Sequence, residues 1–264
     1  MRVAELISLV DELAPFALAE DWDNVGLLVG RADAEVTSVM VALDARPAVI
    51  AAAAEAGCDA VLTHHPVIFP SVTSVSDRTT VGLILLEAAR HGIAIVAAHT
   101  NLDSAVGGLN DRLAAAIGMR EPRPLDAHPE LPGAGLGRVG SVDPVTVGGL
   151  AASLGATLGT GTLAFTGDAD RPVRTVACCT GSGGGFIDAA RAAGADAYVT
   201  GDLRYHDADR ADRLALVCAP HHACEDWALR RWFPDLRDRL TAAGCEATMA
   251  PVDTDPWTSG PAAL

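Results

Sequence analysis

The stretch VLTHHPVIF, residues 61–69, is an apolar run that reaches two adjacent histidines, His64 and His65, just before Pro66. Its apolar and β-favouring residues predict a strand that is buried on both faces. Two imidazoles at the end of such a strand have two interpretations. They form a hydrogen-bonded polar end of the strand, or they are ligands of a metal ion, and the rest of the chain has to decide.

The segments around this strand alternate between strand and helix patterns. An amphipathic helix is expected over residues 3–13. Apolar runs predict strands at 38–45, 59–65 and 93–100, and periodic segments predict helices at about 46–56, 79–92 and 107–118. The second of these helices ends on a glycine, the usual C-terminal stop. This alternation indicates a mostly parallel sheet covered by helices.

Residues 119–135 are rich in Pro, Glu and Gly and are expected to be a connection. After them, the second half of the chain again alternates between strand and helix patterns. Strands are then expected at 162–168, 173–181, 196–202, 214–220 and 245–253, and helices at 146–159, 186–194 and about 222–244. We therefore predict an α/β protein made of two similar α/β domains with mostly parallel or mixed sheets. The domains cover approximately residues 1–125 and 126–264.

The composition limits the partners and the compartment. Half of the 264 residues are hydrophobic and 20% are charged, which is typical of a globular protein. The net charge of −15 argues against nucleic acid or an anionic membrane as the main partner, but bound cations can still hold a nucleotide. The six cysteines include no C-x-x-C pair, which indicates a reducing compartment. A cytoplasmic location is expected, because neither a signal peptide nor an apolar run of transmembrane length is recognisable.

Polar residues follow the predicted strands at several places. In open α/β sheets, binding sites form beyond the carboxyl ends of the strands. Clusters that are far apart in the sequence are therefore expected to meet at one site between the two domains. These clusters are residues 63–65, 99–103, 200–202 and 220–222.

Five side chains in and beside these clusters form a candidate set of metal ligands: His64, His65, Asp103, His221 and Glu225. His221 and Glu225 are four residues apart at the start of a predicted helix and share one face. Three imidazoles and two carboxylates exceed the needs of one tetrahedral catalytic ion and suit two divalent ions. Zn, Fe, Mn, Ni and Co all accept such ligands. Considered alone, His221 and Glu225 could also be two polar residues on a solvent-exposed helix face. Asp103 alone could be a turn residue or a helix cap.

Five motifs occur in a specific order along nearly the whole chain: DWDNVGLLVG, THHPVIF, AAHTNLDSAVGGLND, AYVTGDLRYHDA and the segment from His221 to Glu225. Together they closely resemble the dinuclear-metal-centre family, also called the NGG-interacting-factor-like family. Its bacterial members are commonly labelled GTP cyclohydrolase 1 type 2 homologues. The resemblance implies a pair of α/β domains around two divalent ions, with the same five ligands. It also implies a toroidal homohexamer whose sites face inward.

The chain departs from the family pattern in its last motif, which usually reads Gly-His-Tyr-x-Ser/Thr-Glu. Here residues 220–225 read PHHACE, so the ligand spacing is kept while His222 replaces the tyrosine. His222 is then either an additional base or a spare ligand. Arg204 stands where relatives often have another basic residue. It keeps the positive charge, but its guanidinium presents hydrogen-bond donors in a different arrangement. The short connection over residues 119–140 leaves no room for the middle domain of longer relatives.

Other polar residues in the motifs have two interpretations each. Asp23 and Asn24 support the ligands or contact the substrate, or they form a turn beside Trp22. His99, four residues before Asp103, orients a ligand or is a hydrogen-bonded core histidine.

The residues after the strand at 196–202 form a further candidate group. Asp202 and Tyr205 are expected to support the ligands or to contact the substrate. His206, together with Tyr205, is a candidate acid or base, because histidine titrates near neutral pH. The segment TGSGGGF, residues 180–186, fits a plain tight turn or an anion-binding turn before a helix, but it lacks the lysine of a P-loop.

Two functions fit these patterns. The first is a metal-dependent hydrolase that acts through a metal-activated water on a small-molecule substrate containing a phosphate or a nucleotide, with His206 or His222 assisting proton transfer. The second is a non-catalytic metal-binding ring that serves as a scaffold, as a metal store or chaperone, or as a regulatory partner. The same ligands serve both functions, so whether the protein is an enzyme stays open.

Overall fold

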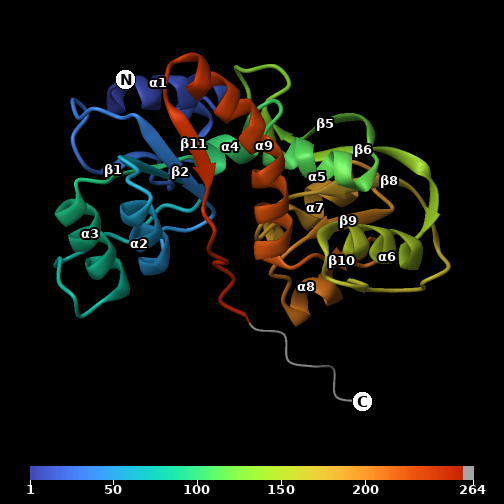
Figure 1. Ribbon diagram of the computed structural model, residues 1–264. Helices are drawn as coiled ribbons and strands as arrows, with labels where there is room; N and C mark the ends of the chain where they lie inside the picture. The colour runs from blue at the N-terminus through green and yellow to red at the C-terminus, as the bar shows by residue number, and fades with distance from the viewer. Residues whose placement is uncertain (258–264) are drawn as a thin grey trace.

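The computed structural model describes residues 1–257, and its helices cover two mixed β-sheets (Figure 1). The first sheet has the strand order β1-β4-β3-β2-β11, and the second has the order β5-β6-β8-β9-β10-β7. The predicted fold class, α/β with mostly parallel or mixed sheets under helices, is confirmed.

The first sheet is built around three parallel strands in its centre. These are β2 (Ser38–Ala42), β3 (Ala60–Thr63) and β4 (Ala94–Ala97). The edge strand β1 (Gly26–Val29) runs antiparallel to β4, and the edge strand β11 (Glu246–Met249) runs parallel to β2. The predicted strands over 38–45, 59–65 and 93–100 are confirmed, but each ends two or three residues early, so its polar tail lies in a loop.

Helices cover both faces of the first sheet. Val39 and Val41 of β2 pack towards α1 (Val3–Leu13) and α9 (His221–Ala242). Met40 and Ala42 point to the other face, against α2 (Pro47–Glu55) and α3 (Thr80–His91). Alternate residues of one strand thus belong to different cores, because successive side chains of a strand point to opposite faces.

The second sheet has the same layered plan. Its parallel centre consists of β8 (Pro172–Cys178), β9 (Ala197–Thr200) and β10 (Ala215–Cys218). One face packs on α5 (Leu109–Ile117) and α6 (Val147–Leu158), and the other packs on α7 (Ile187–Ala192). The remaining helical segments are short: η1 (Phe16–Leu18), α4 (Thr100–Ser104), η2 (Gly184–Phe186) and α8 (Tyr205–Arg210).

One prediction for the second sheet was wrong, and another gave a strand that is too long. The expected connection over 119–135 contains the strand β5 (Arg120–Ala127), which pairs antiparallel with β6 (Gly135–Thr146). Most β5 side chains are exposed, so no apolar pattern marks the strand, and an edge position tolerates its prolines. The strand expected over 162–168 shrinks to the two residues of β7 (Ala164–Phe165), an edge strand antiparallel to β10.

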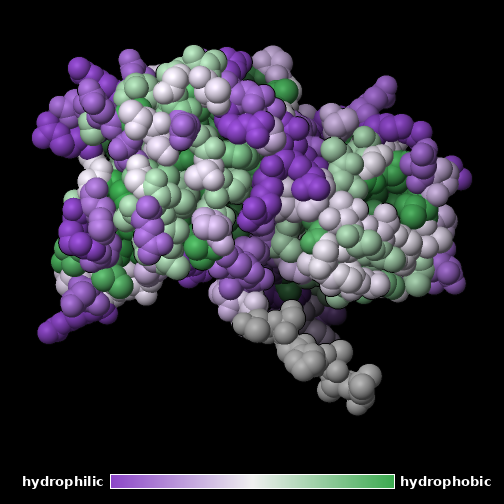
Figure 2. Space-filling view, viewed as in Figure 1, coloured by the Kyte–Doolittle hydropathy of each residue, from purple (hydrophilic) through white to green (hydrophobic). Residues whose placement is uncertain are grey.

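The two sheets do not divide the chain at a single point. The predicted boundary at residue 125 falls inside β5, and β11 lies in the first sheet although it belongs to the segment 126–264. Helix α9 lies between the halves (Figure 1): its Cys224 packs in a core of the second sheet, whereas Trp232 and Leu236 pack in a core of the first. The outer face of α9 is hydrophilic (Figure 2). The division of the chain into domains therefore stays a prediction.

A buried arginine connects the two halves. Arg138 of β6 is 1% exposed and donates to the Asp111 carboxylate of α5 at 2.5 Å. It also donates to the carbonyl oxygens of Gly135, Gly137 and Ala105. Removing one partner of a buried ion pair leaves an uncompensated charge and unpaired acceptors, which is strongly destabilising.

We expect the substitution Arg138→Met to lower the free energy of unfolding by about 3–5 kcal/mol, which urea denaturation would measure. A matched control is Arg120→Met, because Arg120 pairs with Asp143 on the exposed surface and such pairs contribute little. Equal losses of stability in the two variants would contradict the role assigned to Arg138.

Candidate metal centre

The five candidate ligands come from the carboxyl ends of strands in both sheets. His64 and His65 directly follow β3, and Asp103 lies on α4, just after β4. His221 and Glu225 lie on the first turns of α9, which follows β10. His65 Nε2 and His221 Nε2 are 3.4 Å apart, so the two sheets meet at this point through their ligand-bearing ends.

The Glu225 carboxylate lies at the centre of the group. Its Oε2 is 2.9 Å from His65 Nε2 and 3.0 Å from His221 Nε2. Its Oε1 is 3.7 Å from His64 Nε2, which is itself 3.7 Å from Asp103 Oδ2. The structure thus brings together all five side chains that the sequence singled out, and their role as metal ligands stays a prediction.

The histidines around Glu225 are all oriented by a hydrogen bond at Nδ1. His64 Nδ1 donates to the carbonyl oxygen of Ala98 at 2.9 Å, and since a carbonyl only accepts, the hydrogen is on Nδ1. His65 is held in the same way by Asp44 at 2.9 Å, and His221 by Asp202 at 2.6 Å. In each ring Nε2 is left to face the site, which is how histidines are oriented in metal centres.

Two atoms at the centre are buried and lack a hydrogen-bond partner among residues 1–257. They are His64 Nε2 and Glu225 Oε2. Glu225 Oε2 lies 2.9 Å from His65 Nε2 and 3.0 Å from His221 Nε2, and these nitrogens donate to it only when they carry a hydrogen. Buried polar atoms are almost always partnered, so these two atoms point to a ligand that would lie between them. The donor set of imidazoles and carboxylates fits a divalent transition-metal ion.

Sequence reasoning did not single out Asp44. It follows β2 in the same way as His64 and His65 follow β3, and the order of the parallel strands places these ends side by side. The available signal was the acidic residue in SVMVALDA, residues 38–45, at the end of a buried apolar run. Asp202, in contrast, was predicted to support the ligands, and its contact with His221 agrees with that placement.

Asp23 and His99 form a pair on another side of the site. His99 Nδ1 donates to Asp23 Oδ1 at 2.8 Å, and the backbone N–H of Thr100 donates to the second Asp23 oxygen at 3.0 Å. A ring nitrogen of His99 lies within 4.8 Å of ligand atoms of both His64 and His65. His99 therefore belongs to the site, and Asp23 orients it. Asn24 instead donates to the carbonyl oxygen of Ile68 at 2.6 Å and holds a loop.

The glycine-rich segment 180–186 is a packed turn against the site. Two of its N–H groups have protein partners: Thr180 N donates to Asn110, and Gly183 N donates to Thr200. The side chain of Thr180 donates to Asp103 Oδ1 at 2.8 Å. At Gly181, a Cβ atom would lie 2.3 Å from Glu225 Oε1, so glycine is required there to leave room for the carboxylate. These contacts favour the tight turn over the anion-binding turn.

The two predicted acid–base histidines have different positions. His206 and Tyr205 lie on α8 with exposed side chains, and they do not line the cleft beside the ligands. His222 does line that cleft, and its ring contacts Asp253, Thr254 and Asp255 of the C-terminal segment. A catalytic role for His206 therefore receives no support from its placement.

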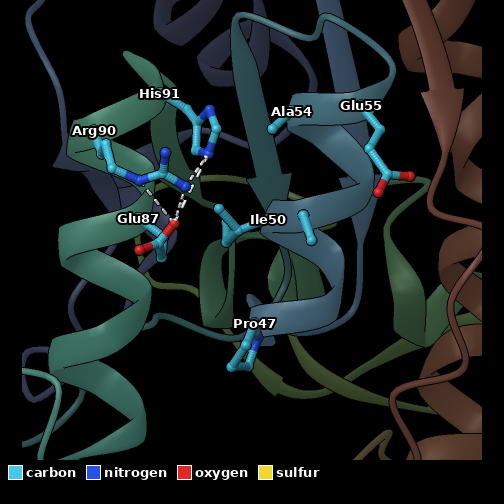
Figure 3. Close-up of a pocket in the computed structure, with 8 residues that line it drawn as sticks. Pro47, Ile50, Ala54, Glu55, Glu87, Arg90 and His91 are labelled. Atoms are coloured by element: carbon cyan, nitrogen blue, oxygen red, sulfur yellow. Dashed lines mark hydrogen bonds and ion pairs between the residues drawn. The ribbon is translucent and has the colours of Figure 1, made fainter.

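A cleft of about 900 Å³ opens beside His65 and His221. A second, smaller pocket of about 220 Å³ lies between α2 and α3. There Arg90 of α3 contacts Glu87 and His91, and Ile50 of α2 faces them (Figure 3). None of the residues lining the smaller pocket is a candidate ligand, so the large cleft is the one that a substrate of this centre would enter.

The close contacts shift the pKa values of the ligands. Burial raises the pKa of Glu225, but the imidazoles of His221, His64 and His65 outweigh burial and hold it well below its usual range. Burial lowers the pKa of His65, but the carboxylates of Asp44 and Glu225 raise it to about 10. For His221, Glu225 and Asp202 likewise outweigh burial and raise the pKa to about 9. Without a metal ion, protons on these imidazoles balance the buried carboxylate.

Comparisons with known proteins agree with this description. The family model of Duf34/NIF3 (NGG1p interacting factor 3) matches residues 1–256. A Streptomyces coelicolor protein named GTP cyclohydrolase 1 type 2 homolog is 37% identical, with 98% of this chain and 94% of the relative covered. A protein of the same name from Clostridium perfringens is 35% identical over 78% of this chain and 79% of the relative.

Solved structures share the fold over nearly the full length. A Bacillus cereus protein related to NIF3 has a TM-score of 0.91 at 24% identity, and a hypothetical Staphylococcus aureus protein has a TM-score of 0.90 at 29% identity. Each comparison covers 98% of this chain and 99% of the other. The fold and site define an α/β protein with a candidate metal centre between two sheets. The chain belongs to the Duf34/NIF3 family. Among residues 1–257, no helix is long and apolar enough to cross a membrane.

The raised pKa values predict how the stability of the metal-free protein depends on pH. A histidine whose pKa is higher in the folded state than its ordinary 6.5 stabilises the fold fully below that value. This stabilisation is lost as the pH rises through about 9 for His221 and about 10 for His65. We therefore expect the melting temperature of chelator-treated protein to fall between pH 7 and the pKa of His65, about 10.

The variant Glu225→Gln is the control for this titration, because it removes the carboxylate that raises both pKa values. Thermal unfolding across the same pH range should show a smaller fall in the variant. An equal fall in the two proteins would assign the effect to other groups, such as cysteine and tyrosine side chains.

Proposed function

We propose that the chain binds two divalent metal ions that share the Glu225 carboxylate. The observation that supports this proposal is that the two oxygens of the Glu225 carboxylate have different neighbouring side chains. Oε1 lies towards His64, which also faces Asp103, whereas Oε2 lies towards His65 and His221. Each oxygen therefore has its own set of imidazole or carboxylate neighbours, and these five side chains would hold the two ions.

The surrounding residues favour Zn, Fe, Mn, Ni or Co bound by nitrogen and oxygen atoms over an ion bound by cysteine thiolates. Cys179 and Cys224 are buried near the site, and burial raises the pKa of both thiols well above the usual range. Cys224 Sγ also donates to the carbonyl oxygen of His221. Among residues 1–257, neither cysteine belongs to the groups of side chains that could hold an ion, which consist of histidines and Glu225, so we propose nitrogen and oxygen ligands.

We propose further that the centre hydrolyses a small-molecule substrate that contains a phosphate or a nucleotide. A pair of divalent ions lowers the pKa of a water molecule and binds a phosphoryl or carbonyl oxygen. His99 is a further candidate for proton transfer, since Asp23 accepts from its Nδ1 and a ring nitrogen of His99 lies within 4.8 Å of ligand atoms of His64 and His65. His222 lines the cleft and is the candidate for proton transfer on the substrate side. The name shared by the relatives, GTP cyclohydrolase 1 type 2 homolog, makes GTP the first substrate to test.

The metal content of the protein, purified without a histidine tag, tests the proposal. We expect mass spectrometry to find about two metal equivalents per chain in the native protein. The variant Glu225→Gln should lose most of this metal, whereas the neighbouring surface variant Asp226→Asn should keep it. Negligible metal in the native protein, even after reconstitution with Zn, Mn and Fe, would contradict the dinuclear centre.

A measurement of turnover distinguishes a metal-dependent hydrolase from a non-catalytic metal-binding ring. The metal-loaded protein should hydrolyse GTP or another nucleotide, and Glu225→Gln should abolish this activity while the protein remains folded by circular dichroism. Two bound metal ions without turnover on nucleotides and phosphate esters would instead favour the non-catalytic metal-binding ring.

We also propose the homohexamer, on the strength of the family resemblance. The native mass in solution, measured by light scattering after size exclusion, should equal six chains. A mass of one or two chains would contradict it.

A further inference from the structure

The large cleft contains residues that the metal centre does not use. Its volume of about 900 Å³ is in the range of sites that hold nucleotide-sized ligands. Its walls come from separate parts of the chain: the loop after β2, the turn after α6, the loop after β9, the start of α9, and residues 255–257. His65 and His221 form part of the same lining, so a ligand in the cleft would lie against the candidate metal centre.

Arg46 carries a positive charge into this cleft. It is half-buried, and its guanidinium makes no hydrogen bond or ion pair with any of residues 1–257. The acidic residues that line the cleft contact histidines: Asp44 contacts His65, Asp202 contacts His221, and Asp255 faces His222. Burial raises the pKa of the Asp44 carboxyl, but His65 and, in part, the nearby Arg46 outweigh burial and lower it, although Arg46 makes no hydrogen bond to this carboxyl. Arg46 is the one arginine among the lining residues that the structure describes. In a chain with a net charge of −15, a guanidinium whose hydrogen-bond donors are not taken up by a carboxylate suits an anionic group of a ligand.

The C-terminal segment supplies an aromatic face to the same cleft. Thr254 is buried, and its hydroxyl lies 3.3 Å from His222 Nε2, so the segment is held against the start of α9. Three residues later, Trp257 lines the cleft with 84% of its surface exposed. Leu203 and Pro256 contribute further apolar surface. An exposed indole on an anchored segment offers a stacking surface for a planar ring.

We propose that the cleft binds a nucleoside phosphate, with its phosphate at the Arg46 guanidinium and its base against the Trp257 indole. This inference deepens the proposed function and rests on it, because it names the residues that recognise the substrate of the metal centre. Arg46 and Trp257 would be specificity-determining residues that bind the two ends of one molecule, and His65 and His221 line the same cleft.

Calorimetric binding of three probes to the metal-loaded protein tests this inference. The probes are GMP, guanosine, which lacks the phosphate, and ribose 5-phosphate, which lacks the base. Arg46→Gln should weaken GMP and ribose 5-phosphate binding about 10-fold or more, the usual loss of a charged hydrogen bond, and leave guanosine unchanged. Trp257→Ala should weaken GMP and guanosine about 5-fold or more, the usual loss of base stacking, and leave ribose 5-phosphate unchanged.

The variant Arg213→Gln is the matched control, because Arg213 is exposed, precedes β10 at the strand end opposite the cleft, and does not line it. It should bind all three probes as the native protein does. Unchanged GMP binding in Arg46→Gln, or no GMP binding to the native protein, would overturn the inference. Equal binding of GMP and ribose 5-phosphate in every variant would remove the role of Trp257 and overturn the two-ended site.

Metal content, measured in the same samples, shows whether a negative result concerns the cleft or the metal centre. Neither Arg46 nor Trp257 contacts a candidate ligand through a hydrogen bond or ion pair, so both variants should keep the native metal content. A protein that holds two metal ions but does not bind GMP would refute the cleft assignment alone. A protein that lacks metal but binds GMP through Arg46 and Trp257 would refute the metal centre alone.

Discussion

The burial of the Glu225 carboxylate is the constraint on which the rest of the site depends. An ionised carboxylate without water costs several kcal/mol unless charges and hydrogen-bond donors surround it. Here the side chain is 4% exposed, and His64, His65 and His221 converge on it. Two of these histidines follow the central strand of one sheet, and the third follows a strand of the other. The pairing of the two sheets is therefore tied to the neutralisation of one charge.

Helix α9 makes this arrangement possible because it belongs to both halves. Its first turns carry His221 and Glu225 beside the second sheet, and Cys224 packs into a core there. Its later turns place Trp232 and Leu236 in a core of the first sheet. The chain then continues into β11, which adds to the first sheet, and the following residues pass back to His222. One continuous segment thus fixes the distance between the sheets and forms a wall of the cleft.

Protons and a bound metal ion would compete for the same positions. The Nδ1 atoms of four histidines are occupied by Ala98, Asp44, Asp202 and Asp23, so only the Nε2 atoms face the centre. With the Glu225 carboxylate held in its charged form, these nitrogens bind either protons or cations. Metal binding here at neutral pH would release protons from His65 and His221, and acid would weaken it. The Gly181 turn adds a steric condition, because any side chain there would move the carboxylate.

The sequence by itself determined the fold class, most of the buried strands and the five candidate ligands. Their signals are local: apolar runs, helical periodicity, polar residues at strand ends, and the four-residue spacing of His221 and Glu225. Tertiary structure alone decided which sheet β11 joins, that the exposed residues of β5 form an edge strand, that Asp44 orients His65, and that His206 lies outside the cleft. These features depend on contacts between residues far apart in the chain. No periodicity of a single segment encodes such contacts, because strand pairing and side-chain convergence arise only when the two sheets pack together.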